Sequence, residues 1–186
     1  MKRVFVVGAS NMDICAKSSD PIREADSNIG VVSTACGGVG RNIAVALRRF
    51  GFEVSFLTAI ADDTFGHDIM TSLKADAVGS VAPFFTGDGL RKELRSGVYS
   101  YVLDSNGALL CGINDMGIND ELTPAFVGGY SNALKAADYL VFEANIPVET
   151  IEYLGSLAKG GVKLAADCVS VSKCELQRGM RPCRYG

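Results

Sequence analysis

The chain has 186 residues, 48% of them hydrophobic, which is enough to bury a sizeable core as a single domain. Its 18 basic and 21 acidic residues give a formal net charge of −3, so the strongly basic footprint of a nucleic-acid-binding protein is missing and we expect no nucleic-acid partner. No apolar run approaches the length of a membrane span, and the apolar stretch after Lys2 and Arg3 is too short for a signal peptide. Six cysteines without a C-x-x-C pair and a single histidine favour reduced thiols and argue against a structural metal, so we expect a cytoplasmic protein.

The first predicted element is a buried strand of a parallel sheet over Val4–Gly8, where the sequence is continuously apolar. Asn11 and Asp13 follow it, and polar residues at the carboxyl end of such a strand face the crevice where open α/β sheets bind ligands. Because the two residues are two positions apart, an extended chain points both side chains the same way, and Asp13 can then accept hydrogen bonds from a pair of sugar hydroxyls. A capping Asx turn is the alternative interpretation of this segment.

Residues 14–36 lack helical periodicity, and we expect a loop with a short β excursion that leaves the main sheet and serves as a lid. The chain returns at a glycine-rich run, Gly-Gly-Val-Gly-Arg-Asn, over residues 37–42. These glycines allow the backbone to turn tightly and to approach a ligand closely, because no Cβ atom stands in the way.

A helix is predicted to begin inside this glycine turn and to end near Gly51. Its free N–H groups, its positive dipole end and the side chain of Asn42 would then face hydroxyls, phosphate or carboxylate. A tight loop that simply feeds a packed helix is the alternative for the glycines alone. The spacing predicts one buried face for this helix, consisting of Ile43, Ala46, Leu47 and Phe50.

The middle of the chain predicts a second buried strand over Val54–Ile60 and an amphipathic helix that carries Ile69 and Leu73. Asp62 and Asp63 lie between them. Paired carboxylates at a helix entry are more often N-terminal caps than acid/base catalysts, so we interpret this pair as caps.

The remaining segments alternate between strand and helix patterns. The runs 98–104 and 108–113 flank an Asn-Gly turn and predict a β-hairpin. The later predictions are a helix from Pro124 through Ala136, a strand over Tyr139–Glu143, a helix after Pro147, a strand over Val162–Ala166 with Asp167 at its carboxyl end, and a disordered tail over 175–186. This alternation predicts an α/β fold with a doubly wound parallel sheet and inserted β-hairpin material.

The glycine-rich run, extended to Ala44 and followed by Gly51, resembles the N-terminal signature of the PfkB carbohydrate kinase family, which has the ribokinase-like fold. Within that family the closest resemblance is to pseudouridine kinases. It is carried by the segments 25–30, 37–44, 100–104, 113–116 and 167–170, and the similarity runs from about Val4 to Cys174. The sequence departs from the family pattern at Ala61, where glycine is expected, and at Cys168, where proline is expected.

The resemblance implies roles for individual residues. Positions that hold sugar or nucleoside hydroxyls in the family correspond here to Asn11, Asp13, Gly38, Val39, Gly40 and Asn42. Asn28 corresponds to the lid, which often also builds a homodimer, so the lid is expected at about 14–36 and 98–113. Glu143 corresponds to an acidic position near the substrate and the metal, and Asp167 to one near the nucleotide, so ATP and Mg²⁺ are the implied cofactors. No metal ligands are assigned to this chain.

In the family, the catalytic base and the anion hole come from an Asp-Thr-x-Gly-Ala-Gly-Asp motif in the C-terminal part, and this sequence contains no such motif. We therefore interpret residues 1–174 as the N-terminal, acceptor-binding part of a truncated ribokinase-like kinase domain, inactive alone. The expected acceptor is pseudouridine, another nucleoside or a sugar. A noncatalytic remnant that binds a nucleoside or a partner subunit is the main alternative, whereas a Rossmann oxidoreductase is disfavoured because Gly8 does not begin a G-x-G-x-x-G pattern.

Overall fold

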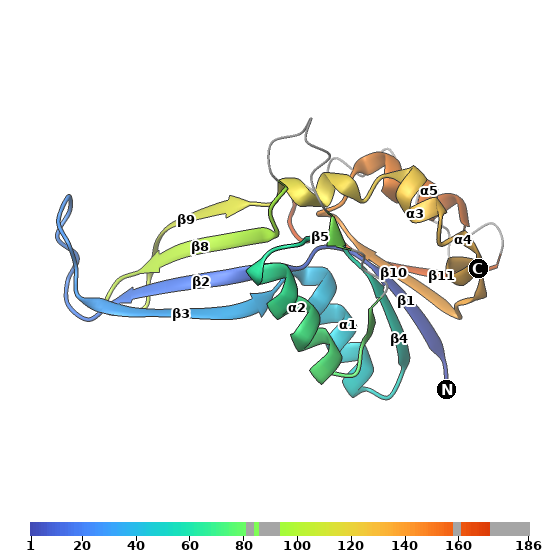
Figure 1. The fold of residues 1–186 in the computed structure, drawn as a ribbon, viewed down its shortest axis with the longest axis horizontal. Coiled ribbons are helices and arrows are strands. Elements are labelled where there is room, and N and C mark those ends of the chain that lie inside the picture. The colour runs from blue at the N-terminus through green and yellow to red at the C-terminus, as the bar shows by residue number, and fades with distance from the viewer. Residues whose placement is uncertain (81–83, 86–93, 158–160, 172–186) are drawn as a thin grey trace.

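The computed structural model describes residues 1–80, 84–85, 94–157 and 161–171. Within these ranges the main sheet has five strands, all parallel, in the order β11-β10-β1-β4-β6 (Figure 1). The strands are β1 (Arg3–Val7), β4 (Glu53–Leu57), β6 (Gly79–Ser80), β10 (Tyr139–Glu143) and β11 (Lys163–Asp167). The predicted doubly wound α/β fold is confirmed. The predicted tail over 175–186 lies outside the described residues.

Helices cover both faces of this sheet, as Figure 1 shows. One face carries α1 (Val39–Arg49) and α2 (Thr64–Ala75), and the other carries α3 (Pro124–Gly128), α4 (Ser131–Ala136) and α5 (Val148–Leu157). Alternate residues of the central strand separate the two cores, because Val4 and Val6 pack with α1 and α2 whereas Phe5 and Val7 pack with α3 to α5. A strand buried on both faces explains the continuous apolar run in the sequence.

The buried face of α1 differs from the predicted one. Gly40, Ala44 and Val45 are buried, whereas Phe50 is 81% exposed. Ile43 and Leu47 are only partly buried and flank the contact. The periodicity of large apolar side chains predicted the wrong face, because the helix approaches the sheet closely through its smallest residues.

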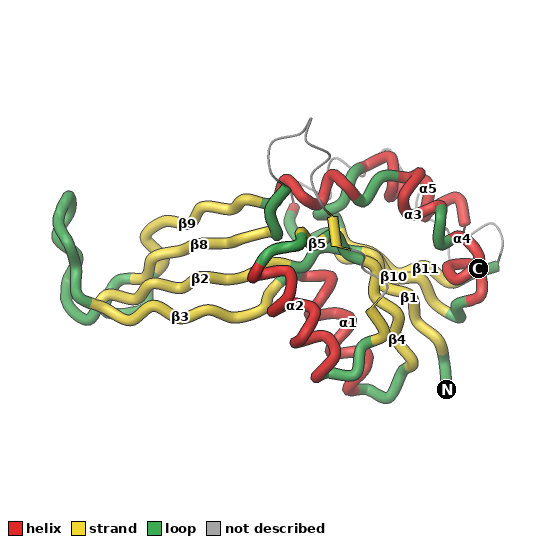
Figure 2. The backbone as a smooth tube through the Cα atoms, in the orientation of Figure 1, coloured by secondary structure: helices red, strands yellow, loops and turns green. Residues whose placement is uncertain are grey.

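The second sheet has the strand order β3-β2-β8-β9 and projects from one end of the main sheet (Figure 2). Its strands are β2 (Asn11–Ser18), β3 (Gly30–Gly37), β8 (Gly97–Leu103) and β9 (Leu109–Asp115). The predicted hairpin is confirmed as β8 and β9, which pair antiparallel. The predicted β excursion over 14–36 is confirmed but is longer than expected, since β2 and β3 form an eight-residue antiparallel pair. Two short strands, β5 (Ile60–Ala61) and β7 (Phe84–Phe85), form a separate parallel pair.

Local sequence determines where two of the helices begin or end. The predicted helix from Pro124 to Ala136 is divided into α3 and α4, because the chain leaves the helix at Gly129 and Tyr130. At the start of α2, the side chain of Asp63 accepts a hydrogen bond from the Gly66 N–H, which confirms the cap predicted for this residue. The prediction that Asp62 is also a cap was wrong, since its carboxylate pairs with the His67 ring over 2.9 Å. Burial favours the neutral acid there, but hydrogen bonds from the backbones of Ser96 and Gly66 outweigh it and hold the pKa of Asp63 below its ordinary value.

Two helical glycines make a matched test of the close approach of α1 to β1. A Cβ atom at Gly40 would lie 2.8 Å from the Cα atom of Gly8, whereas one at Gly155 in α5 would meet nothing within 4 Å. Gly155→Ala should therefore raise the free energy of unfolding by up to about 1 kcal/mol through helix propensity. Gly40→Ala should instead lower it by about 1–3 kcal/mol through overpacking.

Denaturant unfolding of both glycine variants measures the difference. Equal effects of the two substitutions would show that the backbone contact between Gly40 and Gly8 is not tight.

Candidate functional site

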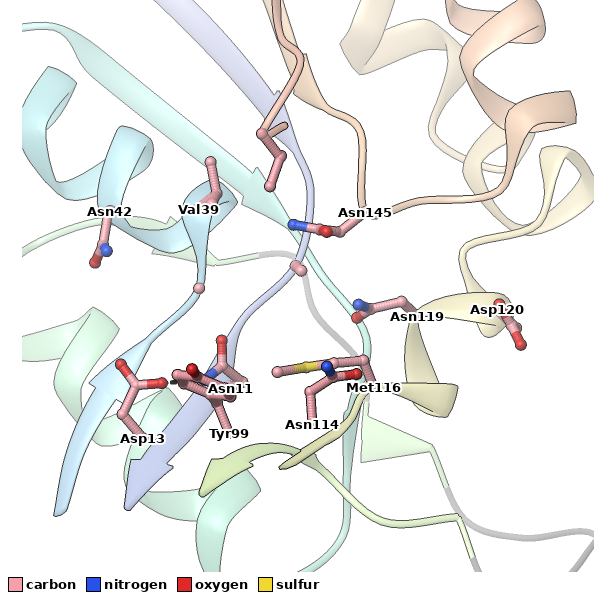
Figure 3. A pocket seen from close by; sticks show the side chains of 13 residues that line it. Asn11, Asp13, Val39, Asn42, Tyr99, Asn114, Met116, Asn119, Asp120 and Asn145 are labelled. Atoms are coloured by element: carbon pink, nitrogen blue, oxygen red, sulfur yellow. Dashed lines mark hydrogen bonds between the residues drawn. The ribbon is translucent and has the colours of Figure 1, made fainter. Parts of the chain in front are cut away.

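A pocket of about 490 Å³ lies where the carboxyl ends of the main-sheet strands meet the base of the second sheet. Its lining comes from the link between β1 and β2, strands β2, β8 and β9, the start of α1, the 3-10 helix η1 (Gly117–Glu121) and the segments after β10 and β11 (Figure 3). The lining residues are Ala9, Asn11, Asp13, Gly38, Val39, Asn42, Tyr99, Asn114, Met116, Asn119, Asp120, Asn145 and Val169. The fold thus gathers the five predicted residues Asn11, Asp13, Gly38, Val39 and Asn42 into one cavity.

Asn11 and Asp13 point the same way because both lie on β2 two positions apart. The Nδ2 atom of Asn11 donates a hydrogen bond to Oδ1 of Asp13 over 2.6 Å. The Asp13 carboxylate lies directly against Gly37, where a Cβ atom would be 2.2 Å from Oδ2. A residue with a side chain at position 37 would therefore displace the carboxylate, and the glycine fixes the place of Asp13 in the pocket.

The glycine turn before α1 brings the helix start against the link between the two sheets. Gly38 has φ of 101°, and a Cβ atom there would lie 2.6 Å from the Ala9 oxygen. The Arg41 N–H donates to the same Ala9 carbonyl over 3.2 Å, so this amide of the first helical turn is occupied by the protein. The expectation that the helix start offers all its early N–H groups to a ligand is therefore wrong for Arg41.

Arg41 also orients the side chain of Asn42. Its guanidinium donates to Oδ1 of Asn42 over 3.2 Å and to Oγ of Ser72 over 2.6 Å, and it forms an ion pair with Asp76 at 3.4 Å. Because a guanidinium offers only N–H donors, the amide of Asn42 turns its oxygen toward Arg41. The Nδ2 group of Asn42 is then the end that can donate to a ligand.

An aromatic surface continues from the pocket along β8. The rings of Tyr99 and Tyr101 stack with centroids 5.1 Å apart and an interplanar angle of 26°. A Cβ atom at Gly112 on β9 would lie 2.6 Å from the Tyr99 hydroxyl, so the glycine makes room for this ring. The hydrogen bond between Tyr101 and Cys15 raises the pKa of the Tyr101 phenol above its ordinary value.

The other predicted site residues do not line the pocket. Gly40 lies behind it, against Gly8. Glu143 is fully buried, and its carboxylate accepts hydrogen bonds from the N–H groups of Ala9 at 2.6 Å and Asn145 at 2.8 Å. Asn28 lies in the loop between β2 and β3, at the end of the second sheet away from the pocket (Figure 1), and bonds within that loop to Arg23 and Asp26.

Asp167 ends β11 and is exposed, and its Oδ1 atom accepts a hydrogen bond from the Val169 N–H over 2.7 Å. Val169 lines the pocket, so Asp167 lies close to its rim without being part of its lining. Within the described residues, no cluster of three or more histidine, cysteine or acidic side chains is placed to hold a metal ion. No helix in the same ranges has both the length and the hydrophobicity to cross a membrane.

Sequence reasoning assigned five of the thirteen residues that line the pocket and missed the other eight. Asn114 and Met116 were noticed only within a segment that carried the family resemblance, and Asn145 only as part of a strand end. Asn119 was overlooked. Their position in the sequence was the signal that could have found them, because each of these residues lies at or shortly after the end of a strand and lines the same pocket.

A sequence model of the "pfkB family carbohydrate kinase" matches residues 1–181 of the chain. The chain belongs to this family. The match confirms the family suggested by the glycine-rich signature, and with it the ribokinase-like character of the fold.

Three relatives show how far the similarity of this pfkB-family chain extends. It is 29% identical to pseudouridine kinase of Escherichia coli over 172 residues, which cover 92% of this chain and 53% of the relative. It is 27% identical to ribokinase of Bacillus subtilis over 155 residues, covering 82% of this chain and 50% of that enzyme. A carbohydrate kinase from Agrobacterium tumefaciens matches in structure with a TM-score of 0.85 and 27% identity, over 95% of this chain and 57% of the other. The chain thus spans about half the length of the relatives it matches.

Glu143 holds the ends of β1 and β10 together beneath the pocket, and this contact can be tested. Glu143→Gln replaces one carboxylate oxygen by an NH₂ group that would face a backbone N–H, leaving a buried donor without an acceptor. We expect the free energy of unfolding to fall by about 1–3 kcal/mol.

The matched control is Glu152→Gln on the exposed side of α5, which should change the free energy of unfolding by no more than about 0.5 kcal/mol. Denaturant unfolding measures both variants. Similar stability of the two would mean that the Glu143 carboxylate is not needed to hold the strand ends.

Proposed function

We propose that this pfkB-family chain forms the acceptor-binding part of a kinase that transfers a phosphoryl group from ATP to a hydroxyl of a nucleoside or sugar, with pseudouridine as the preferred acceptor. One observation carries the proposal. Asn11, Asp13 and Asn42 converge from two segments on one pocket at the carboxyl ends of parallel strands, the place where open α/β sheets bind ligands.

The polar groups on this side of the pocket suit hydroxyls. Oδ1 of Asp13 is held by Asn11, while its carboxylate still has lone pairs for hydroxyl donors. Asn42 presents its NH₂ group, because Arg41 engages its oxygen. Neighbouring hydroxyls of a furanose ring both donate and accept, so an acceptor carboxylate beside a donor amide complements such a pair. These residues would bind and orient the acceptor for transfer.

The nucleoside assignment rests on the relatives and on the shape of the site. The curated relatives include a pseudouridine kinase and a ribokinase, which share the family but differ in the acceptor they are named for. The stacked pair Tyr99 and Tyr101 extends from the pocket and offers a flat surface beside which a base could lie, a feature that a free pentose does not need. We therefore favour a nucleoside over a free sugar.

ATP and Mg²⁺ are the proposed cofactors. Ribokinases of the same fold have been solved with ADP or with ribose and ATP. In this chain Asp167 lies at the rim of the pocket and is the residue we assign to the nucleotide side, but the described residues hold no group of three metal-ligating side chains. Mg²⁺ would supply charge neutralisation at the phosphates, and we assign it no ligand here.

The second sheet is the proposed lid and the proposed contact with a second copy of the chain in the cytoplasm. Both of its edge strands carry exposed apolar side chains, including Val31 and Val32 on β3 and Ile113 on β9. Long apolar edges invite pairing or coverage by another chain. A homodimer through this sheet would cover them.

The first prediction of the proposal concerns Asp13. Asp13→Ala should weaken pseudouridine binding by about 1–3 kcal/mol, because hydroxyl donors of the ligand lose their acceptor. Asp68→Ala, on the exposed face of α2, is the control and should bind as the parent does. Isothermal titration calorimetry measures both. Unchanged affinity in the Asp13 variant would remove this residue from the site.

The second prediction separates binding from catalysis in residues 1–186. We expect pseudouridine to bind more tightly than uridine, adenosine, ribose and fructose, since a site that pairs with a base edge rejects analogues lacking it. We expect no useful phosphoryl transfer from ATP, because the sequence contains no Gly-Ala-Gly-Asp motif to supply a base and an anion hole.

Competition binding and a phosphorylation assay on the same preparation decide between the candidates. Preference for a free sugar would contradict the nucleoside assignment. Robust turnover would show that a catalytic base lies within these residues, and binding without turnover by any longer form of the protein would favour the noncatalytic alternative.

A further inference from the structure

Asn119 lines the pocket and holds a buried polar group that has no partner in the described part of the chain. The residue lies in η1 and is 4% exposed, and its Oδ1 atom is buried without a hydrogen-bond partner among the described residues. Its backbone, in contrast, is paired at both ends, since its N–H donates to the Met116 carbonyl over 3.0 Å and its carbonyl accepts from the Leu122 N–H over 3.1 Å. The unpaired group is therefore one side-chain acceptor, not a poorly formed segment.

The neighbours of Asn119 hold the short helix η1 in the core. Ile118 and Leu122 are 3% and 0% exposed and anchor η1 in the core on the α3 to α5 side of the main sheet. Figure 3 shows the Asn119 amide pointing into the pocket beside Asn145, across from Asp13 and Asn42. A buried acceptor without a partner costs folding free energy, and such a group in a native fold calls for an explanation.

We propose that Asn119 accepts a hydrogen bond from the acceptor substrate and that it determines specificity on the wall opposite Asp13. This inference rests on the proposed function and refines it. The ligand must then carry hydroxyls toward Asp13 and Asn42 and a further N–H or O–H donor at its other side. A ring N–H of a pyrimidine nucleoside and a sugar hydroxyl are the two sources of that donor.

The two sources can be told apart by ligand chemistry. Pseudouridine, a C-linked nucleoside, has two ring N–H groups, uridine has one, and ribose has none. If the donor is a ring N–H, loss of the Asn119 oxygen weakens nucleosides and leaves ribose unchanged. If the donor is a sugar hydroxyl, all three ligands weaken together.

The experiment titrates pseudouridine, uridine and ribose by calorimetry into the parent chain and two variants. Asn119→Leu replaces the amide by an apolar group of similar size, and we expect pseudouridine to bind at least about tenfold more weakly. Asn119→Asp keeps an acceptor oxygen in the same place and should lose less affinity than Asn119→Leu. Asn106→Ala, in the exposed turn between β8 and β9, is the control and should bind as the parent does.

Thermal melting of the unliganded variants adds a readout that a purely structural role would not give. Because Asn119→Leu removes a buried unpaired acceptor, its melting temperature should stay equal to or above that of the parent while its affinity falls. Parent-like affinity in Asn119→Leu, or an equal loss in Asn119→Asp and Asn119→Leu, would overturn the inference and leave the proposed function standing. Failure of the parent chain to bind any of the three ligands would instead overturn the proposed function, and this inference with it.

Discussion

The pocket depends on the backbone contact between Gly8 and Gly40. A Cβ atom at either glycine would come within 3.0 Å of the Cα atom of the other, so only a pair of glycines permits the start of α1 to lie on the end of β1. Glu143 fills the remaining space beside Gly8 and accepts the N–H groups of Ala9 and Asn145. Three segments far apart in the sequence are thereby held at one point. Two or three residues further along each segment, a side chain lines the pocket. These side chains are Asn11, Asn42 and Asn145.

The same point sets the direction of the second sheet. Only three residues separate the end of β1 from the start of β2, and the Ser10 hydroxyl in that link forms a buried hydrogen bond of 2.9 Å with Thr58. Gly38 packs on this link as well, so β2 and β3 leave the main sheet from a fixed base. Tyr99 is placed by pairing of β8 with β2 and by the room that Gly112 leaves for its ring. The wall formed by the second sheet is thus positioned by the same backbone contacts as the start of α1.

The sequence predicted most of the helices and strands, and five of its candidate residues line one wall of the pocket, for a physical reason. Strands buried on both faces are continuously apolar, and Asn11, Asp13 and the glycine run are local motifs whose geometry follows from short spacing. The opposite wall has no local pattern, because Asn119 and Asn145 are single polar residues after separate elements and come together only when the fold is complete.

The face of α1 was mispredicted because periodicity gives weight to large side chains, whereas a close helix contact is made by small ones such as Gly40 and Ala44. Glu143 was predicted as a site residue because it corresponds to an acidic position of the family. Its burial and its hydrogen bonds from two backbone N–H groups depend on the complete fold and could not be predicted from the sequence.

The charges around the pocket bear on which molecule it favours. Of the residues that line it in the described part of the chain, Asp13 and Asp120 are acidic and none is lysine, arginine or histidine. The guanidinium of Arg41 contacts the Asn42 amide oxygen, but it does not line the pocket and its other contacts are Ser72 and Asp76. A ligand that already carries a phosphate would meet carboxylates without a compensating cation, whereas a neutral polyhydroxylated ligand meets acceptors and amides that match its hydroxyls. Under the proposed function, the pocket is therefore better suited to an unphosphorylated acceptor than to a ligand that already carries a phosphate.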